Sequence, residues 1–213
     1  MGISVPNPIL TMIKRKSRVL EKLIKQCPTL LEDLKKELSK QIEEEAAQVA
    51  CGDKEIEASI CSSMYVAAFE DDGELQNNFY QSMLLMVVSY YESIITLFAK
   101  ETRSEDNIHA ICTKKSITLS TETRTNIGYI EEEVNALRNN VCHNNFGTPR
   151  KRDVLEKIAN KSDEIHFHDD VISITGPNYI LNVLNKESEI LLELADRLGY
   201  KNMKFRDGKL TTD

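Results

Sequence analysis

Glycine and proline are scarce in this sequence, and tryptophan is absent. The 213 residues include 8 glycines and 5 prolines, and aromatic residues make up only 6%. Collagen-like chains, disordered Pro/Gly-rich chains and turn-dense all-β proteins need more glycine and proline than this. The hydrophobic share of 41% and the charged share of 29% suffice for one core with a charged surface. The composition therefore favours a largely helical protein with one main domain.

Closely spaced cysteine pairs are also missing. The five cysteines are scattered along the chain, at Cys27, Cys51, Cys61, Cys112 and Cys142. A zinc ribbon needs pairs such as C-x-x-C, and a disulfide framework needs an even set of cysteines in a short chain. Neither class fits this sequence.

Long continuous apolar runs and a recognisable signal peptide are absent as well. No such run approaches the roughly 18 residues that cross a bilayer. The start, MGISVPNPIL, lacks the basic flank and long apolar stretch of a signal peptide. We therefore expect a cytoplasmic protein without membrane contact. The net charge of −7 disfavours nonspecific coating of nucleic acid, although a local basic site remains compatible with it.

Apolar residues recur at helical spacing along most of the chain. The pattern predicts a helix from Pro8 that is broken at Cys27-Pro28, and a second helix that runs up to Gly52. Further helices are predicted over about residues 55–69, 74–101, 127–141 and 178–198. The helix at 74–101 is the most apolar and is therefore expected at the centre of the fold. The segment between residues 101 and 127 is interpreted as a polar link.

The period changes between residues 163 and 175. Ile165 and Phe167 alternate with polar residues, and so do Ile172 and Ile174, while Asp169-Asp170 between them can form a turn. Alternation of this kind is typical of strands. The sequence therefore predicts a small β-hairpin before the last helix.

Polar groups concentrate at the end of the helix around Ile130, in the string from Arg138 to Asn145, RNNVCHNN. Asn139 and His143 lie one turn apart, roughly opposite the apolar stripe through Ile130 and Val141. Arg138 lies on the flank of that stripe, about 140° from His143 on a straight helix. The two head groups meet only if Arg138 curls toward His143, if the helix loosens, or if another helix or subunit covers both.

The word R-N-N-V-C-H resembles the R-x4-6-H motif of the HEPN superfamily, in the form with Asn after Arg that its ribonuclease members carry. Glu92, in SYYESI, resembles the Glu that an earlier helix of such domains often holds. The resemblance covers about residues 75–198. It implies an all-α, up-and-down helical bundle at 74–199 that includes the hairpin, with a helical extension at 1–73 and a tail at 200–213.

By this resemblance the protein is a metal-independent endoribonuclease, without a cofactor, in which the 2′-hydroxyl of RNA attacks the adjacent phosphate. His143 is the expected general base or acid, because its proton exchanges near neutral pH. Arg138 is expected to stabilise the phosphorane, because its guanidinium never loses its charge. Asn139 is the expected orienting donor, and Glu92 and Asn144 are the expected supporting residues.

The resemblance also implies partners. Ribonucleases of this superfamily commonly build the site across a homodimer, serve as toxins or in phage defence, and are restrained by an antitoxin or nucleotidyltransferase. The basic residues Arg150, Lys151 and Arg152 follow the motif directly and are the expected RNA phosphate contacts. The basic cluster at Lys14 to Arg18 is a weaker candidate, because it is far from the motif in sequence.

Each of these residues also has a structural interpretation. His143 can interact with the carbonyls at a helix end, and Arg138 can form a surface ion pair with Glu131. Glu92 can be a half-buried partner of Arg138 or His143, and Asn144 and Asn145 can be cap and turn residues. Under that interpretation the protein is a noncatalytic helical bundle that binds RNA or another protein.

Three further patterns are assigned no function. Arg103 and His109 satisfy R-x5-H by accident, because they lie in the polar link and lack the following Asn. His166 and His168 share one strand face without an obvious third metal ligand, so we interpret them as solvent-facing. Cys142 lies far from His143 around the helix and is interpreted as a packing residue.

Overall fold

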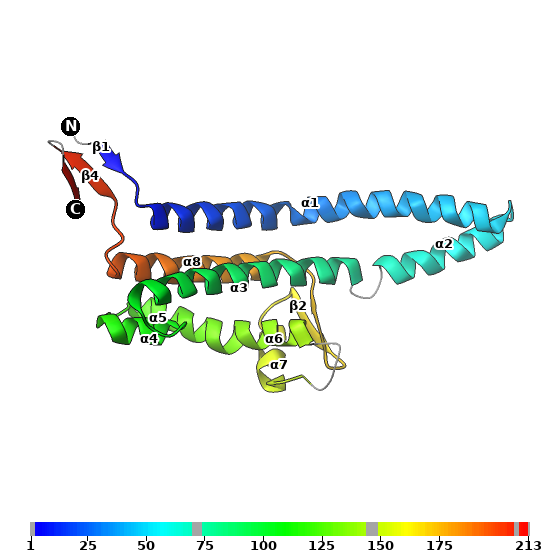
Figure 1. Cartoon of the computed structure of the whole chain (residues 1–213). Helices are drawn as coiled ribbons and strands as arrows, with labels where there is room; N and C mark the ends of the chain where they lie inside the picture. The colour runs from blue at the N-terminus through cyan, green and yellow to red at the C-terminus, as the bar shows by residue number, and fades with distance from the viewer. Residues whose placement is uncertain (1–2, 70–73, 144–148, 207–208, 213) are drawn as a thin grey trace.

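A computed structural model describes residues 3–69, 74–143, 149–206 and 209–212 of the chain. The molecule is mostly helical, and its long first helix lies along one side (Figure 1). The elements in chain order are β1 (Ile3–Val5), α1 (Pro8–Ala50), α2 (Lys54–Phe69), α3 (Glu74–Thr102), α4 (Ile108–Lys115), α5 (Thr121–Tyr129), a π-helical turn (Ile130–Val134), α6 (Asn135–His143), α7 (Arg152–Ala159), β2 (Ile165–His168), β3 (Val171–Ile174), α8 (Asn178–Arg197), β4 (Met203–Arg206) and β5 (Lys209–Thr212).

Helix α3 is the centre of the bundle, as the sequence predicts. It packs against α1, α4, α6 and α8, and Leu84 and Phe98 on it are fully buried. The segment Leu75–Thr102 is long and apolar enough to cross a membrane by length and composition, even though it contains no long continuous apolar run. Half of its most apolar window is nevertheless buried inside the protein, as in the core helix of a bundle.

The expected helix break at Cys27-Pro28 is wrong, because α1 continues through Pro28 to Ala50. A proline inside a helix costs about 3 kcal/mol, because it lacks an N–H and its ring crowds the preceding turn. Ile24, Cys27 and Leu31 lie on one helix face on both sides of the proline, and all three are buried in the main core. Their burial offsets the cost of the proline and keeps the helix continuous.

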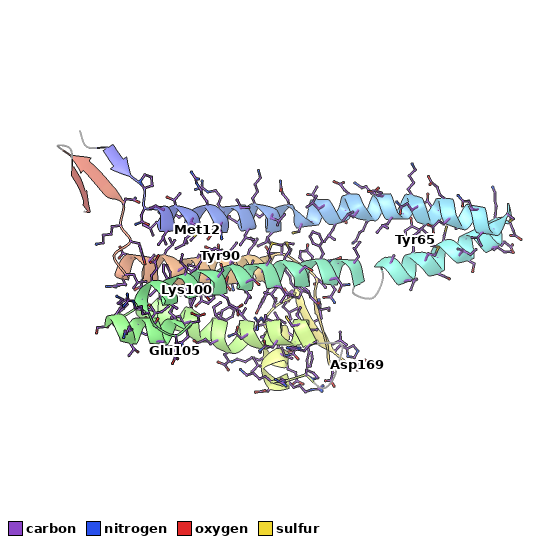
Figure 2. All side chains as sticks on the ribbon, viewed as in Figure 1. Met12, Tyr65, Tyr90, Lys100, Glu105 and Asp169 are labelled. Atoms are coloured by element: carbon purple, nitrogen blue, oxygen red, sulfur yellow. The ribbon has the colours of Figure 1, made fainter. Side chains whose placement is uncertain are left out.

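The second half of α1 and the whole of α2 form an antiparallel pair that extends beyond α3 and α8 (Figure 1). We call residues 32–69 the arm. Ile42, Ala46 and Ala50 of α1 are buried between the two helices, whereas none of the described side chains of α2 is buried. Tyr65 of α2 faces α1 and donates a hydrogen bond to Glu43 over 3.5 Å (Figure 2).

The predicted helix at 55–69 is confirmed. The division of the chain at residue 73 stays a prediction, and residues 70–73 lie outside the described ranges.

The polar link expected between residues 101 and 127 is wrong, because α4 and most of α5 lie there. Both helices begin with a polar capping residue, which a pattern of apolar residues does not reveal. The side chain of Asn107 accepts a hydrogen bond from the N–H of Ala110, and the side chain of Ser120 accepts one from the N–H of Thr123. Caps of this type stabilise short helices whose apolar stripe is only one or two turns long.

The helix expected at 127–141 exists but is not straight. The π-helical turn at Ile130–Val134 separates α5 from α6 and inserts one residue into the helical repeat. The buried face is therefore shifted in α6: Asn140 is buried, whereas Val141, which the pattern placed on the apolar stripe, is only half-buried. A projection of the sequence on a regular α-helix does not include this rotation of the buried face.

The predicted hairpin before the last helix is confirmed. β2 and β3 pair antiparallel, with Ile165 opposite Ile174 and His168 opposite Val171. Asp169 and Asp170 both have positive φ, as a two-residue type I′ turn requires.

The sequence pattern did not predict α7 or the sheet in which β4 pairs with both β1 and β5. That sheet joins the two ends of the chain (Figure 1).

Glu193 of α8 fixes the start of α5. Its carboxylate accepts hydrogen bonds from the Ser120 N–H (2.8 Å), the Ser120 hydroxyl (2.7 Å), the Thr123 hydroxyl and Arg197. Burial opposes ionisation, but the hydrogen bonds outweigh it and lower the pKa of Glu193 to about 2.

The low pKa of Glu193 predicts a loss of stability in acid. The folded state keeps the carboxylate charged below pH 4.5, where the unfolded chain takes up a proton. The stabilisation is therefore complete above about pH 5 and is lost as the pH falls toward 2. We expect Glu193→Gln to lower the free energy of unfolding by about 1–2 kcal/mol at pH 7. The difference between variant and native chain should shrink in urea unfolding at pH 3; a constant difference would contradict the assignment.

Candidate functional site

Arg138 meets Glu92 at the surface between α6 and α3. Its Nη2 lies 3.2 Å from Oε1 and 3.3 Å from Oε2 of Glu92, so one nitrogen contacts both carboxylate oxygens. The side chains are 35% and 49% exposed, respectively. The structure thus brings Arg138 to Glu92, one of the two partners that the sequence suggested. An ion pair this exposed contributes only about 0–1 kcal/mol, so water or a phosphate can replace the carboxylate at little cost.

The guanidinium of Arg138 also contacts the next residue of its own helix, Asn139. Arg138 Nη1 donates to Asn139 Oδ1 over 3.0 Å. Asn139 is exposed and lies one turn before His143, which is exposed at the last residue of α6. The guanidinium therefore curls toward the face of α6 that carries His143. Among the described residues, His143 itself has no hydrogen-bond or ion-pair partner.

The other asparagines of the string from Arg138 to Asn145 fall into two groups. Asn144 and Asn145 lie outside the described residues, so the expected supporting role of Asn144 stays a prediction. Asn140 is buried, and its Nδ2 donates to the carbonyl of Ala136 (2.8 Å) and to that of Arg150 (3.1 Å). Asn140 thereby fixes the chain after the motif against α6. This structural role was not predicted for it.

The three basic residues after the motif are not equivalent. Arg152 contacts Asp170, donates to Glu156 over 3.0 Å and lies 5.4 Å from the centre of the Phe167 ring. Its hydrogen bond to Glu156 and the charge of Asp170 raise its pKa. Arg150 and Lys151 are exposed and form no side-chain ion pair within the described ranges. Of the expected phosphate contacts, these two have free head groups, whereas Arg152 links α7 to the hairpin.

A pocket of about 360 Å³ opens beside Glu92, between α3, α4 and the π-helical turn. Tyr91 and Asn135 line it together with three carboxylates, from Glu92, Asp106 and Glu131. Carboxylates repel phosphate groups. A phosphate can therefore approach Arg138 more easily from the side of Asn139 and His143 than from this pocket.

One carboxylate near this site, Glu187 of α8, is not among the candidates that the sequence patterns suggest. It is fully buried, and neither of its oxygens has a hydrogen-bond partner among the described residues. Burial raises its pKa well above the usual value, and the charge of Glu92 raises it further. The signal was present in the sequence, because Glu187 occupies the apolar stripe between Leu184 and Leu191. Buried carboxylates with shifted pKa values are enriched at functional sites.

The other candidate residues have structural surroundings. Glu131 does not pair with Arg138, because its carboxylate lies 3.1 Å from His109 Nε2. His166 Nε2 lies 3.2 Å from the Thr175 hydroxyl, and His168 lies 3.5 Å from Asp169. Cys142 is exposed, not packed as expected. No cluster of three or more potential metal ligands occurs in the part of the chain that the structure describes.

Comparisons with family models, curated proteins and solved structures find no match to this chain. The resemblance to the HEPN superfamily therefore stays a hypothesis, which depends on the R-N-N-V-C-H word and on the arrangement of the residues around it.

Proposed function

We propose that the protein is a metal-independent endoribonuclease of the HEPN type. One observation supports this most: the guanidinium of Arg138 donates a hydrogen bond to Asn139, which lies one helical turn before His143 on α6. A permanent cation, an amide and an imidazole thus come from one helix, with the amide in contact with the cation. These are the groups that cleavage of RNA by its own 2′-hydroxyl requires.

In the proposed reaction, His143 takes the proton of the 2′-hydroxyl while the oxygen attacks the adjacent phosphorus. A bond from the 2′ oxygen to phosphorus forms, and the bond from phosphorus to the 5′ oxygen breaks. The leaving 5′ oxygen receives a proton from the imidazolium of His143 on a second copy of the chain. The products are a 2′,3′-cyclic phosphate and a 5′-hydroxyl.

Arg138 acts on the phosphate rather than on protons. Negative charge increases on the nonbridging oxygens in the transition state, and the guanidinium stabilises that charge. Binding of the phosphate replaces Glu92 as a partner, and the amide of Asn139 keeps the guanidinium oriented. Arg150 and Lys151 contribute contacts to neighbouring phosphates.

The test is cleavage of a mixed RNA pool by the purified protein in excess EDTA. We expect cleavage, and we expect fragments that end in 2′,3′-cyclic phosphates and 5′-hydroxyls. The control is Arg138→Ala combined with His143→Ala, purified in parallel to detect a contaminating nuclease. A folded native protein that leaves the RNA pool intact, or cleavage that the double variant retains, would overturn the proposal.

A second candidate function is RNA binding without catalysis. It is favoured by one observation: Arg138 already pairs with Glu92, and no contact joins it to His143 within the described residues. In this case the protein binds the RNA pool but does not cleave it, and Arg150→Ala with Lys151→Ala weakens the binding. The same RNA pool, measured for binding and for cleavage, distinguishes the two functions.

A further inference from the structure

The pocket between α3, α4 and the π-helical turn has a mixed lining. Its cavity of about 360 Å³ is large enough for one nucleobase. Its charged lining residues are three carboxylates, and its apolar lining residues include Ile95, Ile108 and Ile130. Apolar walls with a few acceptor groups are typical of sites for flat organic rings. An uncharged ring whose edge carries hydrogen-bond donors therefore suits this pocket better than a phosphate.

Asp106 has the most free acceptor capacity of the three carboxylates. Glu92 and Glu131 each contact a basic side chain, whereas Asp106 forms no ion pair within the described residues. Its Oδ2 accepts from the Thr96 hydroxyl over 3.4 Å, and its Oδ1 accepts no hydrogen bond from the described residues. Asp106 is also exposed, so a ligand in the pocket has access to its carboxylate.

Two uncharged polar side chains of the lining also lack partners. Neither the Asn135 amide nor the Tyr91 hydroxyl has a hydrogen-bond partner in the described part of the chain, although both residues are half-buried. Burial raises the pKa of Tyr91, so its hydroxyl keeps its proton and can donate. Polar groups in such surroundings bind water or a ligand. The pocket therefore offers free donors as well as a free carboxylate.

Asn135 connects the pocket to the candidate site. It is the first residue of α6 and lies one turn before Arg138, whereas His143 is the last residue of the helix. Residues three apart share one helix face, and eight residues span about 12 Å along an α-helix. The pocket and His143 therefore lie on opposite sides of Arg138 along α6.

We propose that this pocket binds a guanine base of single-stranded RNA, from the nucleotide whose 5′ phosphate contacts Arg138. Guanine presents two adjacent donors on its Watson–Crick edge, N1–H and the N2 amino group, which match the two oxygens of one carboxylate. Asp106 accepts both hydrogen bonds, and the Asn135 amide donates to O6 of the base. Unpaired RNA bases are commonly recognised in this way, by their Watson–Crick edge and by contacts to their ring faces.

Other occupants match the lining less well. Uracil presents one N–H between two carbonyl oxygens, so one of these oxygens would face the carboxylate. Adenine presents a single amino group beside an acceptor nitrogen. An amine or a guanidinium would place its charge among apolar side chains, and two of the three carboxylates already contact basic groups.

The placement of the phosphate rests on the proposed ribonuclease function, whereas the selection of the base does not. In the proposed reaction the attacking 2′-hydroxyl lies near His143, and the pocket lies on the other side of Arg138. The base in the pocket therefore belongs to the nucleotide that follows the cut. Each new 5′ end is then a guanosine with a free 5′-hydroxyl.

Nucleotide binding to the full native chain tests the base without any cleavage. We expect guanosine 5′-monophosphate to bind at least tenfold more tightly than uridine or adenosine 5′-monophosphate in isothermal titration calorimetry. Spermidine serves as the probe for a pocket that binds organic cations. Equal affinities for the three nucleotides, or binding of spermidine alone, would overturn the proposal.

Replacement of Asp106 by asparagine tests which side chain reads the base. An asparagine offers one acceptor and one donor, the pair that adenine matches, so the variant should bind adenosine 5′-monophosphate more tightly than guanosine 5′-monophosphate. The matched control is Glu105→Gln, at an exposed carboxylate that does not line the pocket and should keep the native order (Figure 2). An Asp106→Asn variant that keeps the native order, or that weakens all nucleotides equally, would contradict the assignment.

The fragment ends separate this inference from the proposed function. Cleavage of the RNA pool with guanosine at most new 5′ ends supports both. Cleavage without a preference for guanosine would overturn the inference and leave the ribonuclease intact. Guanosine-selective binding by a chain that does not cleave RNA would support the pocket and overturn the ribonuclease.

Discussion

Replacement of His143 by alanine is expected to reduce the rate of RNA cleavage by at least a hundredfold. A side chain that takes and returns a proton in the transition state contributes about 10²- to 10⁴-fold. His143 is exposed at the end of α6, so its removal should change the free energy of unfolding by no more than about 0.5 kcal/mol. Thermal unfolding and the initial rate of fragment formation, measured on the same preparation, separate the two effects.

The sequence provides a matched control in His109, the histidine of the accidental R-x5-H pattern. His109 is exposed on a helix like His143, and it lies 3.1 Å from Glu131. His109→Ala should retain the native rate. Arg138→Ala should lose about 10²- to 10³-fold, as expected when one transition-state donor is removed. Equal rates for His143→Ala and His109→Ala would refute the assignment of His143.

The sequence predicted the general class of the fold because burial has a regular period. The central helix, the hairpin and the last helix all follow from apolar residues at helical or strand spacing. Pro28 shows the limit of local rules: its cost of about 3 kcal/mol is local, whereas the burial of Ile24, Cys27 and Leu31 that offsets it depends on distant elements. The N-termini of α4 and α5 each depend on a single capping side chain, Asn107 and Ser120 respectively. A pattern of apolar residues does not reveal these caps.

The site was less predictable than the fold, because it depends on side-chain direction. On a straight helix Arg138 and His143 point about 140° apart, and only the structure has Arg138 turn to Asn139 and Glu92. The π-helical turn changes which side of α6 faces the core, so Asn140 is structural although it lies within the motif. Glu187 could have been found, because a carboxylate interrupts an otherwise apolar stripe in α8.

Replacement of Glu187 by glutamine should stabilise the protein at pH 8 and have little effect at pH 4. Burial and the charge of Glu92 raise the pKa of Glu187 well above its usual value, so the folded chain keeps a proton that the unfolded chain loses above pH 4.5. The free energy of unfolding of the native chain therefore falls as the pH rises, by up to about 1.4 kcal/mol per unit, until the pH passes the folded-state pKa. Glutamine does not ionise, so this slope disappears.

We expect the gain at pH 8 to be about 2–3 kcal/mol, because a buried ionisable group without partners costs about this much. For a chain of this size each kcal/mol raises the melting temperature by about 2–4 °C. Asp196→Asn is the control, since Asp196 is exposed on the same helix and its replacement should shift stability by less than about 0.5 kcal/mol. A Glu187→Gln variant with native stability at pH 8 would contradict the raised pKa.

The same variant connects stability to function. Glu187 has no hydrogen-bond partner among the described residues, and its pKa is raised by burial and by the charge of Glu92, the partner of Arg138. Active sites often contain groups that lower stability, so Glu187 is a candidate for a role in activity. If Glu187→Gln melts at a higher temperature but cleaves RNA more slowly, or over a shifted pH range, Glu187 is a positioning residue that acts through Glu92. A more stable variant with the native rate and pH profile would show that it has no such role.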